Sequence, residues 1–280
     1  MLKRIITSVV AAVFVLLPAL IFSHTVVFPL AVGIVTVIGI FEMLKCIGLH
    51  KRLSLAIPIY LAALVLPMGV RYCEDRMLLA TVCFIFAVAY LIYLFVHIIW
   101  SHGSLGFSDG ALLFITSLYI IAAMSCIVYI RDFGEGGKYG YLLIFIGAWI
   151  TDIFAYFTGR FLGKHKLIED VSPKKTIEGS IGGIVFCTLS FVVFGVVINA
   201  FFNGSANLIF LAVCGFIASV VSQVGDLIMS VIKRHYGIKD YGKIFPGHGG
   251  MLDRFDSVLA VSLAIGALCM LSSIIGINMI

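Results

Sequence analysis

The sequence predicts an all-α, polytopic integral membrane protein with about nine transmembrane helices and a cytoplasmic N-terminus. Composition is the first reason: 62% of the 280 residues are hydrophobic, 12% are charged, and the mean hydropathy is +1.17. A soluble domain is usually about 45–50% apolar and about 25% charged. The other reasons are the regular recurrence of long apolar runs and an uneven distribution of basic residues between the loops.

The apolar runs are long enough to cross a bilayer, which takes roughly 17–25 residues. We predict spans at 5–22, 26–45, 55–70, 77–100, 111–130, 141–158, 181–202, 207–229 and 257–279. The run at 55–70 is short and contains Pro58 and Pro67, so a broken or re-entrant segment is the alternative there. No small-residue cleavage pattern follows the first run, which predicts an uncleaved span and not a signal peptide.

The basic residues predict the orientation, because cytoplasmic loops carry an excess of Lys and Arg. With the N-terminus inside, 15 of the 19 basic residues fall on the cytoplasmic side and four outside. This topology places two long polar loops, 159–180 and 230–256, in the cytoplasm. The net charge of +5 is concentrated there, which suggests an anionic partner, either phosphates or acidic lipid headgroups.

The chain divides into two predicted regions. Residues 1–140 resemble a scaffold of transmembrane helices, in which Glu42 is interpreted as a carboxylate at the cytoplasmic edge beside Lys45. Residues 141–280 form the predicted catalytic region and contain both polar loops. The sequence has no GxxxxGK[ST] and no GxGxxG motif, so the usual soluble nucleotide-binding folds are not predicted, and neither is a nucleic-acid partner.

Four aspartates of this region, Asp152, Asp226, Asp253 and Asp256, lie within or at the ends of apolar spans. A carboxylate in hydrocarbon is costly unless it is paired, protonated, hydrated or bound to a cation. Asp253 and Asp256 are three residues apart and can project from one side of a helix, and Asp226 could complete a Mg²⁺ site. Ion pairs with nearby Lys and Arg are the alternative, above all for Asp152. The seven histidines show no HExxH pattern, so zinc is not predicted.

Cations and glycines surround these carboxylates. Alternating Asp with Lys or Arg is typical of phosphoryl and nucleotidyl transfer, in which metal and cations neutralise a polyphosphate. The glycines of 242–250 break any helix and allow backbone N–H groups to approach phosphate oxygens. His248 lies between two of them and is interpreted as a hydrogen-bond donor to phosphate or as a turn residue.

The segment 230–256, SVIKRHYGIKDYGKIFPGHGGMLDRFD, resembles the signature of the CDP-diacylglycerol synthases, also called phosphatidate cytidylyltransferases. Three upstream segments, 152–164, 172–179 and 222–227, also resemble that family. The detailed resemblance covers residues 145–257, and the rest of the chain is similar through hydropathy only.

The resemblance implies transfer of CMP from CTP to phosphatidic acid, which gives CDP-diacylglycerol and pyrophosphate for phospholipid synthesis. The lipid phosphate attacks the α-phosphorus of CTP in line, with Mg²⁺ held by Asp226, Asp253 and Asp256; a second cation is left open. The implied catalytic residues are Asp226, Lys239, Asp253 and Asp256. The implied substrate-binding residues are Ser222, Ser230, Lys233, Arg234, His248, Arg254, Lys174 and Lys175.

The implied location is the inner (plasma) membrane, in a multi-pass enzyme whose active site faces the cytoplasm. The expected partners are CTP, phosphatidic acid and the bilayer, and a homodimer is an expectation from the family. Two alternatives stay open: a CTP-dependent lipid-alcohol kinase, which would transfer the γ-phosphoryl group, and an ion-coupled transporter. The transporter is less favoured because the polar residues gather at one membrane face.

Overall fold

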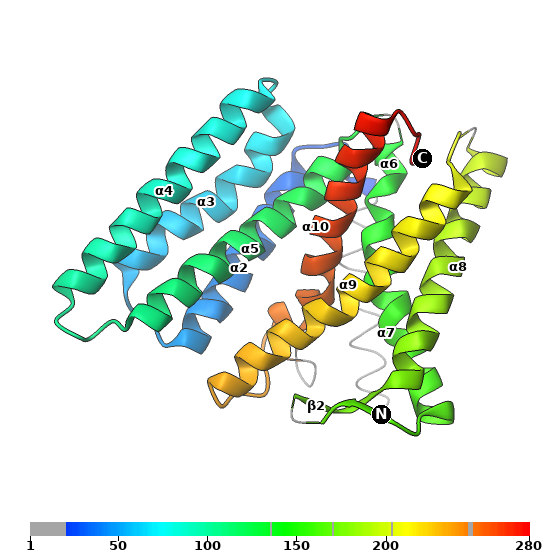
Figure 1. Ribbon diagram of the computed structural model, residues 1–280. Helices are drawn as coiled ribbons and strands as arrows, with labels where there is room; N and C mark the ends of the chain where they lie inside the picture. The colour runs from blue at the N-terminus through cyan, green and yellow to red at the C-terminus, as the bar shows by residue number, and fades with distance from the viewer. Residues whose placement is uncertain (1–20, 135, 170, 203, 246–248) are drawn as a thin grey trace. The chain divides into compact units, whose positions relative to one another are not determined.

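The computed structural model describes residues 21–134, 136–169, 171–202, 204–245 and 249–280. These residues form long helices and one short two-stranded sheet (Figure 1). In chain order the elements are α2 (Val27–Ile47), α3 (Leu53–Tyr72), α4 (Arg76–Trp100), α5 (Phe107–Arg131), α6 (Gly137–Gly140), α7 (Leu142–Leu162), β1 (Lys166–Ile168), β2 (Ser172–Thr176), α8 (Ile177–Phe201), α9 (Leu208–His235) and α10 (Leu252–Ile275).

Within the described residues, eight helices are long and apolar enough to cross a membrane. They correspond to the eight predicted spans from 26–45 to 257–279, so the all-α, polytopic fold class is confirmed. The predicted first span, 5–22, lies almost wholly outside the described residues.

Helix α3 agrees with the predicted span at 55–70, because it is a continuous 20-residue helix; the alternative of a broken segment does not hold. A proline inside a helix removes the N–H that would bond to the carbonyl four residues earlier. At Pro58 that carbonyl belongs to Ser54, and it accepts a hydrogen bond of 3.1 Å from the Tyr93 hydroxyl of α4. A neighbouring helix therefore supplies the missing donor, as transmembrane helices with proline require.

The chain forms two compact units. The first unit comprises the residues up to Val128 together with Asp240–Asp253, and the second comprises Tyr129–Lys239 with Arg254–Ile280. In the first unit, α2 packs against α3, and α3 against α4. Its core is apolar and includes the fully buried side chains of Ile40, Leu44, Leu55 and Ile59.

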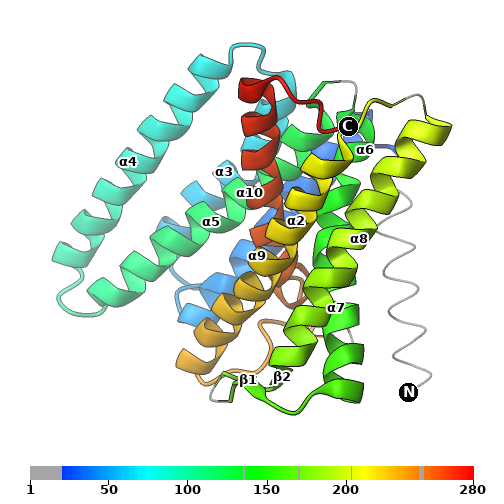
Figure 2. The same cartoon turned by 45° about the vertical axis from the view of Figure 1, so that its right-hand side comes forward.

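In the second unit, α8 packs against both α7 and α9, and the three helices lie side by side in both views (Figures 1 and 2). Glycines on α8 make this packing close. A Cβ at Gly183 would lie 3.0 Å from the carbonyl oxygen of Thr151, and a Cβ at Gly182 would overlap Thr158. Small residues let transmembrane helices approach in this way.

Helix α10 of the second unit is also packed through glycines. Gly147 of α7 faces Val261, and Gly225 of α9 lies against Ala260, where a Cβ would overlap the alanine methyl group. The same Cβ would be 3.2 Å from the carbonyl oxygen of Asp256. Because Gly225 precedes Asp226, this close approach places the backbones that carry the two aspartates next to each other.

The polar loop 159–180 contains an antiparallel β-hairpin that the sequence did not predict, with Lys166 of β1 paired to Thr176 of β2. The Thr176 side chain accepts from the Gly179 N–H at 3.1 Å and caps α8. The Glu178 carboxylate accepts from the His165 ring at 2.7 Å and from the backbone N–H groups of Lys164 and His165. The hairpin is therefore fixed at both ends, and it carries the predicted cations Lys174 and Lys175.

Candidate active site

Three carboxylates of the second unit gather from three helices: Asp152 from α7, Asp226 from α9 and Asp256 from α10. Asp226 interacts electrostatically with both Asp152 and Asp256, and Asp256 also interacts with Asp152. We call these residues the acidic cluster. The structure thus brings together two of the three predicted metal ligands and adds Asp152, for which an ion pair was the main alternative.

Cations surround the acidic cluster. The Lys175 ammonium forms an ion pair with the Asp226 carboxylate at 2.5 Å, and both side chains are 25% exposed. The buried Lys233 interacts electrostatically with Asp256, and the exposed Arg254 with Asp152. Each carboxylate of the cluster therefore has a basic neighbour. These positive charges offset the negative charge of the carboxylates, which would otherwise repel a polyanion.

Ser257 connects the cluster and was not predicted from the sequence. Its hydroxyl donates to Asp152 at 3.3 Å, and its backbone N–H donates to Asp256 at 2.9 Å. Ser257 is buried. A serine in an apolar run does not by itself indicate a functional role. Only its position directly after Asp256 could have suggested that Ser257 belongs to the site.

Asp253 and Glu42 belong to the first unit and bind backbone groups. Asp253 is buried, and one of its oxygens accepts from the N–H groups of Tyr241 at 2.8 Å and Gly250 at 2.9 Å. Glu42 interacts electrostatically with Lys45, the neighbour expected from the sequence, and its side chain is only 2% exposed. Its two oxygens accept from Met251 and Leu252 at the start of α10. The partners lie more than 200 residues away in sequence, so local pattern could not reveal them.

The other predicted residues differ in exposure. Ser222 is fully buried, and its hydroxyl has no hydrogen-bond partner among the described residues. Ser230 is half-buried, whereas Lys174, Lys239 and Arg234 are exposed. Arg234 donates to the carbonyl of Ile238 at 3.2 Å. His248 lies outside the described residues.

A sequence profile of the cytidylyltransferase family matches residues 2–272. The chain belongs to the cytidylyltransferase family. A protein of Bacillus subtilis (strain 168) named phosphatidate cytidylyltransferase is 34% identical over 267 residues, which cover 93% of this chain and 94% of the relative. Relatives of the same name from Staphylococcus haemolyticus and Staphylococcus saprophyticus are 40% and 38% identical over 161 residues, or 58% of this chain. Those matches span 59% of the length of the staphylococcal relatives.

The acidic side chains fit a magnesium ion in chemical type. Mg²⁺ takes oxygen ligands and is usually held by one or two carboxylates together with waters and substrate phosphates. Asp226 and Asp256 offer such oxygens, and Lys175 already neutralises one of them. Within the described parts of the chain, no group of three or more His, Cys, Asp or Glu side chains could hold a metal.

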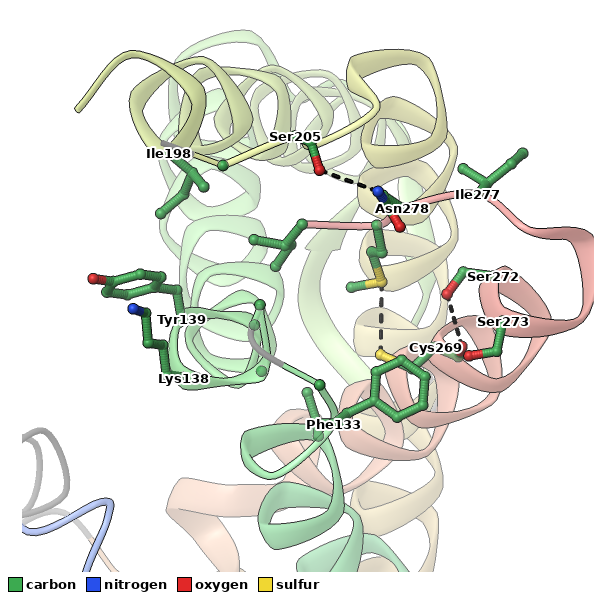
Figure 3. Close-up of a pocket in the computed structure, with 18 of the residues that line it drawn as sticks. Phe133, Lys138, Tyr139, Ile198, Ser205, Cys269, Ser272, Ser273, Ile277 and Asn278 are labelled. Carbon is green, nitrogen blue, oxygen red and sulfur yellow. Dashed lines mark hydrogen bonds between the residues drawn. The ribbon is translucent and has the colours of Figure 1, made fainter. Parts of the chain in front are cut away.

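The second unit also contains a cavity of about 530 Å³ at the other end of its helices (Figure 3). Phe133 and Tyr139 line one side, and Ile277 and Asn278 another; the Asn278 side chain donates to Ser205 at 3.1 Å. Ser272 lines this cavity and lies 16 residues after Asp256 on α10, which is roughly 24 Å along a helix. In this member of the cytidylyltransferase family, the cavity is thus remote from the acidic cluster.

Proposed function

We propose that the protein transfers CMP from CTP to phosphatidic acid, forming CDP-diacylglycerol and pyrophosphate. The family membership and the names of the relatives support a cytidylyl transfer. The observation that carries the proposal is the acidic cluster with its cations, Lys175, Lys233 and Arg254. Such alternation of fixed acids and bases is what binding and activating a triphosphate requires.

In this reaction an oxygen of the lipid phosphate bonds to the α-phosphorus of CTP. The bond between the α-phosphorus and the bridging oxygen breaks, and pyrophosphate leaves with that electron pair. The lipid supplies the nucleophile, so no covalent enzyme intermediate is needed. Ser222 and Ser230 then serve as hydrogen-bond donors. Among the described residues, no basic side chain forms a hydrogen bond with either hydroxyl that would activate it as a nucleophile.

The cations bind and orient the phosphates. Lys175 and Lys233 approach the acidic cluster from different elements, β2 and α9, so a triphosphate bound between them would be held from two sides. The exposed Lys174, Lys239, Arg234 and Arg254 are proposed to bind the remaining phosphate charge of CTP or of the lipid. The catalytic role of Lys239 is to stabilise the charge that develops on the leaving pyrophosphate.

Asp226, Asp253 and Asp256 are proposed to hold Mg²⁺, which when bound would neutralise the phosphates of CTP. Asp253 and Asp256 project from the first turns of the same helix, α10. Lys175 competes for the Asp226 carboxylate, so it keeps that charge compensated until the substrate arrives.

The site is proposed to face the cytoplasm, in the inner membrane of the cell. CTP is a soluble polyanion, whereas the acyl chains of phosphatidic acid remain in the bilayer, so the reaction belongs at the interface. The bias of 15 basic residues against four between the predicted loops supports that side.

The test is to purify the protein in detergent and to measure pyrophosphate release with CTP, phosphatidic acid and Mg²⁺, omitting each in turn. We expect release only with all three present, and label from [α-³²P]CTP in the lipid product. Label from [γ-³²P]CTP in lipid would instead identify a kinase. Absence of pyrophosphate release, with flux of a substrate in liposomes, would favour a transporter and refute the proposal.

A further inference from the structure

The first unit contains a carboxylate that the proposed reaction does not use. Glu42 lies in α2, is 2% exposed, and accepts from the Met251 N–H at 2.9 Å and the Leu252 N–H at 2.8 Å. Helix α10 begins at Leu252. The first N–H groups of a helix have no partner within it and carry partial positive charge. Glu42 therefore performs from another helix the function of a capping residue.

Two glycines leave room for this carboxylate. A Cβ on Gly242 or on Gly250 would overlap the carboxylate of Glu42. Gly249 between them has a φ of +86°, which favours glycine for a separate reason. The glycines of this segment, which the sequence suggested as a phosphate cradle, thus include two that are fitted around Glu42.

Asp253 also binds backbone groups of the segment 240–253. Its carboxylate accepts from the N–H groups of Tyr241 and Gly250, so two separate points of the backbone are bound to it. Together Glu42 and Asp253 bind four N–H groups of the segment 240–253. A short segment with few apolar side chains is in this way held by two buried acids.

We propose that Glu42 is a positioning residue for the cytidylyl transfer. It fixes the start of α10 and thereby the direction in which Asp253 projects from the first turn of that helix. The inference rests on the proposed function. It gives α2, which belongs to the region predicted as scaffold, a role in orienting a proposed metal ligand. A purely structural role for Glu42 would stabilise the whole first unit and have no specific effect on the segment 240–253.

Hydrogen exchange of the purified protein tests the contact directly. In Glu42→Gln the side chain keeps its size, but its NH₂ group must face one of the two N–H donors. We expect the peptides that cover 240–253 to exchange about 10- to 100-fold faster, as for loss of a hydrogen bond to a charged group, with unchanged exchange in α3 and α4. The exposed Glu74→Gln of the same unit is the matched control. Faster exchange throughout the first unit would overturn the proposal.

The Mg²⁺ dependence of the rate tests the functional step. Glu42→Gln should raise the Mg²⁺ concentration for half-maximal rate about tenfold, the lower end of the contribution of residues that orient metal ligands. Excess Mg²⁺ should restore much of the rate. An equal loss of rate at every Mg²⁺ concentration would indicate only less folded enzyme and would overturn the positioning role.

A double-mutant cycle with Gly250→Ala links the two observations. The added methyl group displaces the Glu42 carboxylate, so Gly250→Ala should mimic Glu42→Gln, and the two effects on exchange should not add. Additive effects would show that the glycine and the glutamate act separately, against the proposal. Failure of the proposed function would appear as an inactive wild-type protein, whereas failure of this inference appears only in the variants.

Discussion

The protein holds two groups of acidic side chains in different ways. In the first unit, Glu42 and Asp253 are bound by backbone N–H groups. In the second, Asp152, Asp226 and Asp256 face the side chains of lysine and arginine. Backbone donors are fixed by the fold, whereas a lysine side chain can rotate away. The first group is therefore suited to setting geometry, and the second to exchanging partners when phosphates arrive.

The largest effect on the rate is expected for Asp253→Asn. This substitution removes the negative charge of the side chain and keeps its shape. The asparagine carbonyl can still accept from Tyr241 and Gly250, so the protein should remain folded in detergent. The negative charge proposed to hold Mg²⁺ is lost, and we expect a rate about 100- to 1,000-fold lower, the scale of losing one preorganised electrostatic contact. Pyrophosphate release and the thermal unfolding midpoint measure the two consequences, with Glu74→Gln as control. Normal turnover would mean that Asp253 belongs only to the group that sets geometry.

Gly225→Ala is expected to have the next largest effect. The new methyl group would overlap Ala260, so α9 and α10 must separate, and with them Asp226 and Asp256. Overpacking of this kind costs about 1–3 kcal/mol, and a displacement of about 1 Å can reduce turnover up to about 100-fold. Gly106→Ala is the control, since its Cβ would meet its nearest atom at 3.4 Å. Unchanged turnover in Gly225→Ala would show that the spacing within the acidic cluster is not critical.

Sequence alone predicted the helical spans, because hydropathy is a property of each segment by itself. It also identified Asp226, Asp253 and Asp256 as side chains that need partners. It could not predict those partners, since Lys175 reaches Asp226 through an unpredicted hairpin and Glu42 reaches Met251 across 209 residues. The alternative of a broken segment at 55–70 stayed open for the same reason, because the donor that compensates Pro58 comes from Tyr93 of another helix.

Lys175→Met tests whether the lysine that pairs with Asp226 also binds the phosphates of CTP. The substitution leaves Asp226 without its ion-pair partner and removes one proposed phosphate contact. We expect an increase of about tenfold in KM for CTP, equivalent to about 1.4 kcal/mol, with a smaller change in kcat. Lys164→Met is the matched control in the same polar loop, where the side chain is exposed. Equal effects of the two substitutions would indicate general attraction of CTP by surface charge and not a specific role of the pair with Asp226.

Ser257→Ala should have the smallest effect of these substitutions. It tests how much a single side-chain hydrogen bond contributes to the acidic cluster. The hydroxyl donates to Asp152 at 3.3 Å, a long hydrogen bond, whereas the N–H that binds Asp256 is retained in the variant. Loss of a typical hydrogen bond costs about 0.5–1.5 kcal/mol, so we expect a slightly lower unfolding midpoint and a rate within about fivefold of wild type. Ser262→Ala on the same helix removes a hydroxyl that donates to Leu259 within α10 and is the control. If Ser257→Ala instead lowered the rate as much as Lys175→Met, Asp152 would depend on the Ser257 hydroxyl as much as on its basic neighbours.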